Sequence, residues 1–154
     1  MKYLGLDFVS AVKSLADQYG VHIPEANQEK FSKEQIQQHK QHKLDINQTM
    51  ISAMNFYRKT LAGSSYALHY LQHRGLTTAI INQFDLGFAL NNFQNLAANF
   101  NDYAKNKLLL DGGLVIENEN GKRYDRFRER IMFPIKNVKG EIIGFGGRII
   151  GQGE

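Results

Sequence analysis

The chain has 154 residues, of which 42% are hydrophobic, and it carries 19 basic and 15 acidic side chains. This length and composition exclude a wholly disordered chain and allow one domain with a buried core, alone or with one further segment. The absence of cysteine excludes disulfides and cysteine-bound zinc and is compatible with a reducing cytoplasm. No run of 18 apolar residues is present, so we expect no transmembrane helix and no membrane partner.

The N-terminal residues predict a short amphipathic helix followed by a polar stretch. Asp7 is a plausible N-cap, apolar residues recur at helical spacing as far as Tyr19, and Gly20 is a natural stop. Residues 25–47 are rich in Gln and Lys and have few apolar side chains, which is typical of a linker, a solvated helix, or both. We take this stretch as the boundary between an N-terminal segment and the main domain.

The helical period returns after this boundary. Apolar residues at helical spacing predict a helix over residues 46–61, which ends at Gly63. Ser64 and Thr77 are suited to cap the two helices that follow. In chain order we expect further helices at 65–74, 78–84, 93–100 and 103–110, with a buried strand at 86–90.

After Gly113 the apolar period changes from that of a helix to that of strands. The Asn120-Gly121 dipeptide indicates a hairpin turn, and Pro134 places its strand at a sheet edge or a strand end. The expected strands are residues 114–116, 123–127, 130–135, 141–145 and 148–150. Several helices followed by a small antiparallel-rich mixed sheet define the α+β class.

The positive charge is concentrated in this C-terminal part. Residues 121–148 carry eight basic and three acidic side chains, a net charge of +5, which leaves −1 for the rest of a chain whose total is +4. Such a patch is typical of a surface that binds a phosphate backbone or a nucleotide. It is equally compatible with a solvated basic hairpin.

Within this part, residues 124–130 alternate basic and other side chains. In an extended strand Arg126, Arg128 and Arg130 would share one face, about 7 Å apart, a spacing that roughly matches phosphates of an extended single strand. Tyr124 and Phe127 would be available for stacking or for the core. Alternatively, the three arginines form ion pairs with acids from the helices.

Two further motifs have weaker meaning. Glycines in a strand, as in residues 144–148, mark a bulge, a packing bend, or a close approach to a ligand. His69 and His73 have the i, i+4 spacing of metal ligands, but residue 70 is Tyr rather than the Glu of a zinc-protease motif, so a histidine pair without metal is favoured. No pair of carboxylates is spaced for metal binding or acid–base chemistry, so we expect no catalytic residue and no metal site here.

Taken together, residues 121–135 and 140–148 closely resemble the N-terminal part of the RNA polymerase core of bacterial replicative DNA primases of the DnaG type. Residues 70–76 and 84–89 fit the same family in order and spacing. Residues 6–12 resemble the end of the primase zinc-binding domain.

The resemblance implies a template-directed RNA polymerase that makes short RNA primers on single-stranded DNA for replication in the bacterial cytoplasm. It implies three parts: residues 1–26 as the tail of the zinc-binding domain, 27–47 as a polar linker, and 48–154 as the N-terminal subdomain of the core. The Toprim domain, with its metal-binding carboxylates, and the helicase-binding domain would lie outside this chain. The expected partners are single-stranded DNA, ribonucleotides and RNA primer, with the replicative helicase, Mg²⁺ or Mn²⁺, and Zn²⁺ belonging to the longer protein.

The resemblance also implies which residues form the groove for template and nucleotide. Basic residues of the family's groove match Arg74, Arg126, Arg128 and Arg148, and less closely Arg130 and Lys122. Gly146 and Gly147 match positions where the backbone comes close to the active-site cleft. The rival hypothesis is a stand-alone adaptor domain that binds a protein partner and uses its arginines structurally.

Overall fold

The computed structural model describes residues 15, 16, 18–20 and 33–151. The chain divides into two compact units, residues 1–37 and 38–154, and the fold below is that of the second unit. Of the helix expected at residues 7–19, only residues 15, 16, 18 and 19 are described, and these are helical. The rest of that helix lies outside the described residues.

Three helices come first in the second unit, and the long α2 (Lys33–Ala62) begins before the unit boundary. Its buried residues all lie in its C-terminal half. From Met50 they recur every three or four positions, at Ala53, Tyr57 and Leu61, and Thr49 lies next to Met50. The sequence predicts a helix that begins at residue 46, whereas α2 begins 13 residues earlier, at Lys33. Residues 33–47 of the polar stretch are thus helical. α3 (Ser65–His73) and α4 (Thr78–Gln83) follow, with Ser64 and Thr77 as their N-caps.

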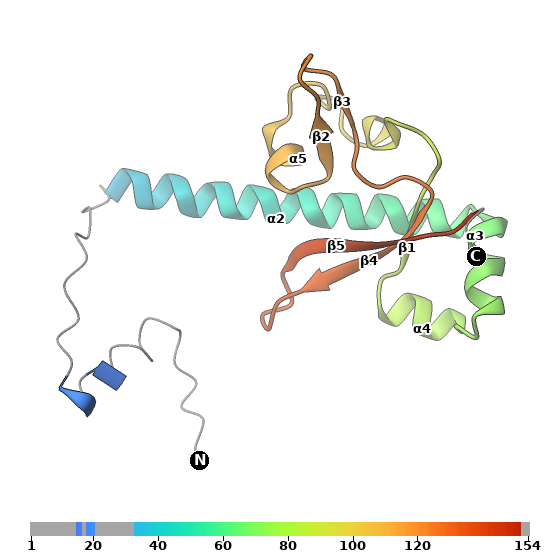
Figure 1. Ribbon diagram of the computed structural model, residues 1–154, viewed down its shortest axis with the longest axis horizontal. Coiled ribbons are helices and arrows are strands. Elements are labelled where there is room, and N and C mark those ends of the chain that lie inside the picture. Colours follow the sequence, from blue (N-terminus) through green and yellow to red (C-terminus); the bar gives the residue numbers. More distant parts are fainter. Residues whose placement is uncertain (1–14, 17, 21–32, 152–154) are drawn as a thin grey trace. The chain divides into compact units, whose positions relative to one another are not determined.

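Two antiparallel sheets complete the fold (Figure 1). The first has the order β1-β4-β5, formed by β1 (Gly87–Ala89), β4 (Arg130–Lys136) and β5 (Ile142–Ile149). The second pairs β2 (Val115–Glu117) with β3 (Arg123–Asp125). Helices combined with small antiparallel sheets confirm the α+β class.

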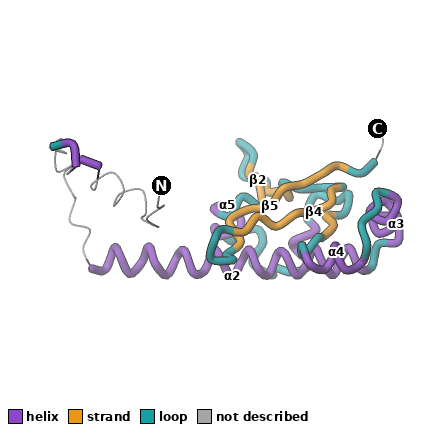
Figure 2. Tube along the Cα trace, turned by 90° about the horizontal axis from the view of Figure 1, so that it is seen from below, coloured by secondary structure: helices purple, strands orange, loops and turns teal. Residues whose placement is uncertain are grey.

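The core has two parts. Met50, Ala53 and Tyr57 of α2 pack against Met132 of β4 and Ile142 of β5, and α2 runs beside these strands in both views (Figures 1 and 2). The second cluster joins α3 and α4 to the other face of the first sheet, through Ala67, Leu71, Ile81, Phe88 and Ile131. Most buried residues of α2 thus lie on the opposite face of the sheet from α3, and Leu61 in the last turn of α2 joins the second cluster.

The expected helices at 93–100 and 103–110 are wrong as full helices. They shrink to the 3₁₀-helix η1 (Asn95–Ala98) and the short α5 (Lys107–Asp111). The side-chain amide of Asn95 donates to the backbone oxygens of Leu90 and Asn92, and this local bonding competes with a regular helix.

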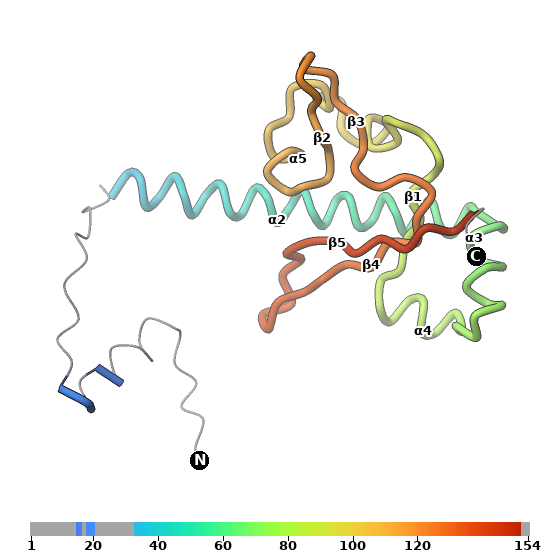
Figure 3. The backbone as a smooth tube through the Cα atoms, in the orientation of Figure 1, coloured from blue at the N-terminus to red at the C-terminus, as the bar shows by residue number. Residues whose placement is uncertain are grey.

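The strand expected at residues 123–127 is also shorter than predicted, and it does not continue into the strand that begins at residue 130. β3 ends at Asp125 in one sheet and β4 begins at Arg130 in the other. Glu129 has a φ of 50°, a left-handed conformation that ends an extended strand. Residues 126–129 therefore form a crossover between the two sheets, which can be followed in orange in Figure 3.

Candidate nucleic-acid interface

A buried carboxylate holds the start of the crossover. The Asp125 side chain is 1% exposed and accepts hydrogen bonds from the Tyr103 hydroxyl (2.8 Å) and the Leu96 backbone N–H (3.1 Å). Burial raises the pKa of Asp125, and these hydrogen bonds and the positive charge of Arg128 oppose part of that shift. Asp125 therefore ties β3 to the first turn of η1.

The backbone adds a second tie at the same point. The Asp125 N–H donates to the Phe93 carbonyl (2.7 Å), and the Gln94 side-chain amide donates to the Arg123 carbonyl (3.0 Å). The loop that precedes η1 is thereby fixed beside β3. This brings Phe93 next to a residue that lies 35 positions further along the chain, Arg128.

Arg128 and Phe93 form the centre of the candidate site. The Arg128 guanidinium lies over the Phe93 ring, 4.4 Å from its centroid, and 5.6 Å from the Tyr124 ring centroid. Its Nη1 is buried and has no hydrogen-bond partner among the described residues. The Phe93 ring is 64% exposed. A fixed positive charge beside an exposed aromatic ring suits the attraction of a phosphate and the stacking of a base.

Sequence reasoning did not identify Phe93, since that residue was placed inside an expected helix. Tyr124 was identified as a stacking candidate, and it lies against Arg128. The local sequence signal for Phe93 is its position directly after the turn-forming Asn91-Asn92 pair, which favours a loop at this point of the chain.

The other basic residues of this region differ in surroundings. Arg126 is exposed, and its guanidinium makes no hydrogen bond or ion pair with a described residue, while its backbone N–H donates to Leu114. Lys122 is exposed beside the β2–β3 turn. Arg123 is structural, because it pairs with Glu117 (2.6 Å) and donates to the Asn106 carbonyl (2.9 Å).

A second basic pair lies at α3. The Arg148 Nε of β5 is 3.4 Å from the Tyr70 hydroxyl, and the Arg74 guanidinium is 5.4 Å from the centroid of the same ring. Tyr70 therefore brings together two cations that lie 74 positions apart in the sequence.

Strand register separates Arg130 from Arg148. In the β4–β5 ladder Arg130 lies opposite Ile149, and Arg148 lies opposite Ile131. Because opposite residues share a face and successive residues alternate, Arg130 and Arg148 point to opposite faces of the sheet. The expectation of Arg126, Arg128 and Arg130 on one strand face is wrong, because the crossover separates the first two from β4.

The two glycines of the expected site also differ. A Cβ on Gly147 would lie 3.0 Å from both the Arg130 Cδ and the Phe127 Cδ1, so these side chains occupy the space above it. A Cβ on Gly146 would meet nothing closer than 3.9 Å. Gly147 therefore has a packing role, whereas the fold leaves Gly146 open.

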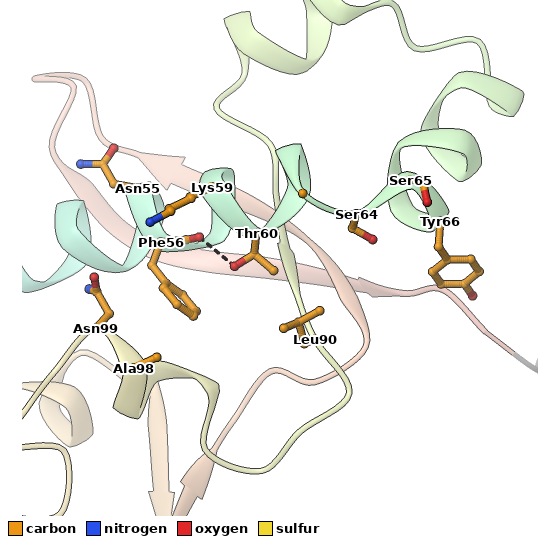
Figure 4. Close-up of a pocket in the computed structure, with 11 residues that line it drawn as sticks. Asn55, Phe56, Lys59, Thr60, Ser64, Ser65, Tyr66, Leu90, Ala98 and Asn99 are labelled. Atoms are coloured by element: carbon orange, nitrogen blue, oxygen red, sulfur yellow. Dashed lines mark hydrogen bonds between the residues drawn. The ribbon is translucent and has the colours of Figure 1, made fainter.

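A pocket of about 730 Å³ lies elsewhere, between α2, the start of α3 and the loop after β1 (Figure 4). Phe56 and Leu90 line it together with the polar ends of Lys59 and Asn99. The Thr60 hydroxyl in its wall already donates to the Phe56 carbonyl (3.0 Å). None of the sequence-predicted site residues lines this pocket.

Within the described part of the chain, no three His, Asp or Glu side chains come together in a way that could hold a metal ion. In the same residues, no helix is long and apolar enough to cross a membrane.

Comparison with known proteins shows the family to which this chain belongs. The family model described as "DNA primase catalytic core, N-terminal domain" matches residues 56–154. The DNA primase of Salmonella typhimurium is 41% identical over 99% of this chain, and that of Pasteurella multocida is 40% identical over the same share. The chain therefore belongs to the DNA primase catalytic core family. It spans about a quarter (26%) of the length of these two relatives.

Solved structures give the same relationship. A DnaG primase catalytic domain bound to single-stranded DNA is 35% identical, with a TM-score of 0.66 over 73% of this chain and 37% of that one. A DNA primase domain from Pseudomonas aeruginosa is 42% identical, with a TM-score of 0.64 over 71% and 36%. An Aquifex aeolicus primase structure with zinc-binding and RNA polymerase domains is 28% identical, with a TM-score of 0.60 over 99% and 34%.

Proposed function

We propose that this chain is part of a DNA primase, a DNA-directed RNA polymerase that makes short RNA primers on single-stranded DNA for replication. Its own contribution is a basic surface that holds the template strand. The observation that carries the proposal is the Arg128 guanidinium, held 4.4 Å from the centroid of the exposed Phe93 ring in the basic part of the chain. A relative of the same family was solved with single-stranded DNA bound.

The absence of ion pairs favours this function over a protein adaptor. If the arginines were structural, Arg126, Arg128 and Arg130 would pair with acids, yet within the described residues none of the three forms a salt bridge. Arg123 shows what a structural arginine looks like in this fold, with a carboxylate and carbonyl oxygens around it. We therefore propose template binding first at Arg126 and Arg128, with Arg74, Arg148 and Lys122 as further candidates. Arg130 points to the opposite face of the sheet from Arg148 and does not share a surface with it.

The proposal also covers the longer protein to which this chain would belong. Similarity over 99% of the chain to a primase with zinc-binding and RNA polymerase domains supports the proposal that this chain joins the end of the first domain to the start of the second. The proposed parts are residues 1–26 as the tail of the zinc-binding domain, 27–47 as the connection, which includes the start of α2, and 48–154 as the core subdomain. Ribonucleotides and RNA primer are the proposed further partners. Mg²⁺ or Mn²⁺, Zn²⁺, the replicative helicase and a cytoplasmic location are proposed for the longer protein, and we derive no metal-dependent step for this chain.

The proposal predicts a salt-dependent affinity for single-stranded DNA. Each neutralised phosphate contributes a slope of roughly −0.7 to the logarithm of the binding constant plotted against the logarithm of salt concentration. The double variant Arg126→Ala/Arg128→Ala should flatten that slope by about one to one and a half units. Fluorescence anisotropy with a labelled thymidine oligonucleotide at several salt concentrations measures it.

The matched control is Lys40→Ala/Lys43→Ala, which removes the same charge from exposed positions on α2. It should leave the slope unchanged. An unchanged slope in the arginine variant would place the DNA elsewhere. Unfolding of that variant, seen by circular dichroism, would show that the arginines are structural.

A further inference from the structure

Two pockets flank the C-terminal end of α2. The first is the pocket of about 730 Å³ between α2, the start of α3 and the loop after β1 (Figure 4). The second, of about 490 Å³, lies between α2, α3 and α4. Asn55 and Lys59 line both pockets, so these two exposed side chains of α2 form a ridge between them. We call the two pockets together with this ridge the two-pocket surface.

Both pockets contain apolar side chains that a partner could cover. Phe56 and Leu90 line the first pocket and point into the same space in Figure 4, and Leu90 is 43% exposed. Leu68 and Ile81 line the second pocket, where they belong to the cluster that joins α3 and α4 to the first sheet. Each pocket is large enough for one bulky apolar side chain.

Lys59 supplies an available charge at the ridge. Its ammonium group forms no ion pair or hydrogen bond with a described residue, and no described acidic residue lines either pocket. The neighbouring Arg58 differs, because it pairs with Asp85 at 3.1 Å. An unpaired cation between two apolar pockets favours an occupant that carries a carboxylate between two apolar groups.

The number of cations and the width of the ridge favour a peptide over a nucleic-acid strand. A nucleic-acid strand has one phosphate per nucleotide and binds through several cations along its path. Among the described residues that line the two pockets, Lys59 is the one cation without an ion pair. A helix with its side chains is about 10 Å wide, a width that an extended peptide crosses in about three residues.

We propose that the two-pocket surface binds a short segment of a partner protein in which an acidic residue lies between two large apolar residues. One apolar side chain fills each pocket, and the carboxylate pairs with Lys59 on the ridge. This inference is independent of the proposed function, because none of the residues proposed for template binding lines either pocket.

The test uses a synthetic peptide of this pattern, Gly-Phe-Ser-Glu-Ser-Leu-Gly, with blocked ends so that the glutamate is its only charge. Titration of the peptide into the isotope-labelled 154-residue chain, followed by NMR, gives a dissociation constant and the amides that shift. We expect a dissociation constant below about 1 mM and shifts in residues 55–60 and 63–66. Glycine in place of the peptide's Phe or Leu should weaken binding about tenfold through lost apolar contact.

Charge reversal tests the contact at the ridge. Lys59→Glu should weaken binding about fivefold or more, and a peptide with Lys in place of its Glu should recover the lost affinity for this variant. Lys43→Glu is the matched control, because it reverses an exposed charge on the same helix away from both pockets. It should leave the affinity for the peptide unchanged, as should Arg126→Ala/Arg128→Ala.

Each other outcome overturns the inference. A dissociation constant above about 1 mM, or shifts confined to other elements, contradicts a peptide site here whatever the stability of the protein variants. Equal losses in Lys59→Glu and Lys43→Glu would show attraction by net charge alone. A dimer that Lys59→Glu dissociates, seen by analytical ultracentrifugation, would make a second copy of this chain the occupant. Displacement of the peptide by a thymidine oligonucleotide would assign the surface to nucleic acid.

Discussion

At the scale of single residues, Asp125 determines the candidate site without being exposed to any ligand. Its side chain accepts from Tyr103 and Leu96, and its backbone N–H fixes Phe93. The nearby Tyr57 hydroxyl is buried without a partner among the described residues, and burial, followed by the charge of Asp125, raises the pKa of Tyr57. A carboxylate in such surroundings is costly to ionise, so the geometry of the basic surface depends on a group whose charge opposes folding.

This cost predicts how stability depends on pH. Because burial raises the pKa of Asp125 above its ordinary 3.8, the stability that it contributes is fully present below that pH and is lost as the pH rises through the folded-state pKa. Asp125→Asn removes the titration. The free energy of unfolding of the wild-type chain minus that of the variant should therefore decrease as the pH rises through this window. Urea unfolding at a series of pH values measures the difference, and a difference that grows with pH contradicts it.

At the scale of elements, the sequence predicts well what is decided locally. Ser64 and Thr77 cap their helices as expected, and Asn120-Gly121 forms the turn of the β2–β3 hairpin, where Gly121 has a φ of 73°. These features depend on side chains and backbone groups within four residues of one another. The same is true of the amphipathic period of α2 up to Leu61.

What the sequence could not predict depends on distant contacts. The break after Asp125 follows from hydrogen bonds to residues 22 and 29 positions earlier in the chain, whereas the alternation of residues 124–130 is that of one continuous strand. Arg130 and Arg148 lie on opposite faces because of the register between β4 and β5. This register cannot be read from the residue types of the two strands. The resemblance to primases supplied the site residues but not the two groups into which the fold divides them.

One contact between elements gives a sharp prediction, that of α2 with β1. A Cβ on Gly87 would lie 2.5 Å from the Tyr57 Cβ and 2.8 Å from the Tyr57 backbone carbon, so the strand touches the helix backbone. Gly87→Ala must push the two elements apart and should lower the free energy of unfolding by about 2 kcal/mol or more. Urea unfolding measures it. Gly63→Ala, where the nearest atoms are 3.7 Å away, is the control and should change stability by less than about 0.5 kcal/mol.

At the scale of the whole molecule, the basic side chains of the candidate site and the side chains of the hydrophobic core lie in different parts of the fold. Both hydrophobic clusters lie between the first sheet and its helices, and the second sheet joins the cluster that contains Met50, Ala53 and Tyr57 of α2. The crossover carries Arg126 and Arg128, and Arg148 lies near the end of β5, beside Tyr70 of α3. Removing the cation at Arg126 therefore changes the surface while the packing that holds it remains.

The same separation leads to the last prediction, that the 154-residue chain alone makes no primers with any divalent metal. Phosphoryl transfer by polymerases depends on metal ions that stabilise the attacking and leaving oxygens, and acidic side chains hold those ions. Among the residues that the structure describes, no such group of ligands comes together. Incubation with a single-stranded template, labelled ribonucleotides and Mg²⁺ or Mn²⁺ should give no labelled RNA, although the chain binds the template under the same conditions. Template binding measured in parallel is the control for a folded chain. Primer synthesis by a homogeneous preparation would show that the chain itself holds the catalytic metal.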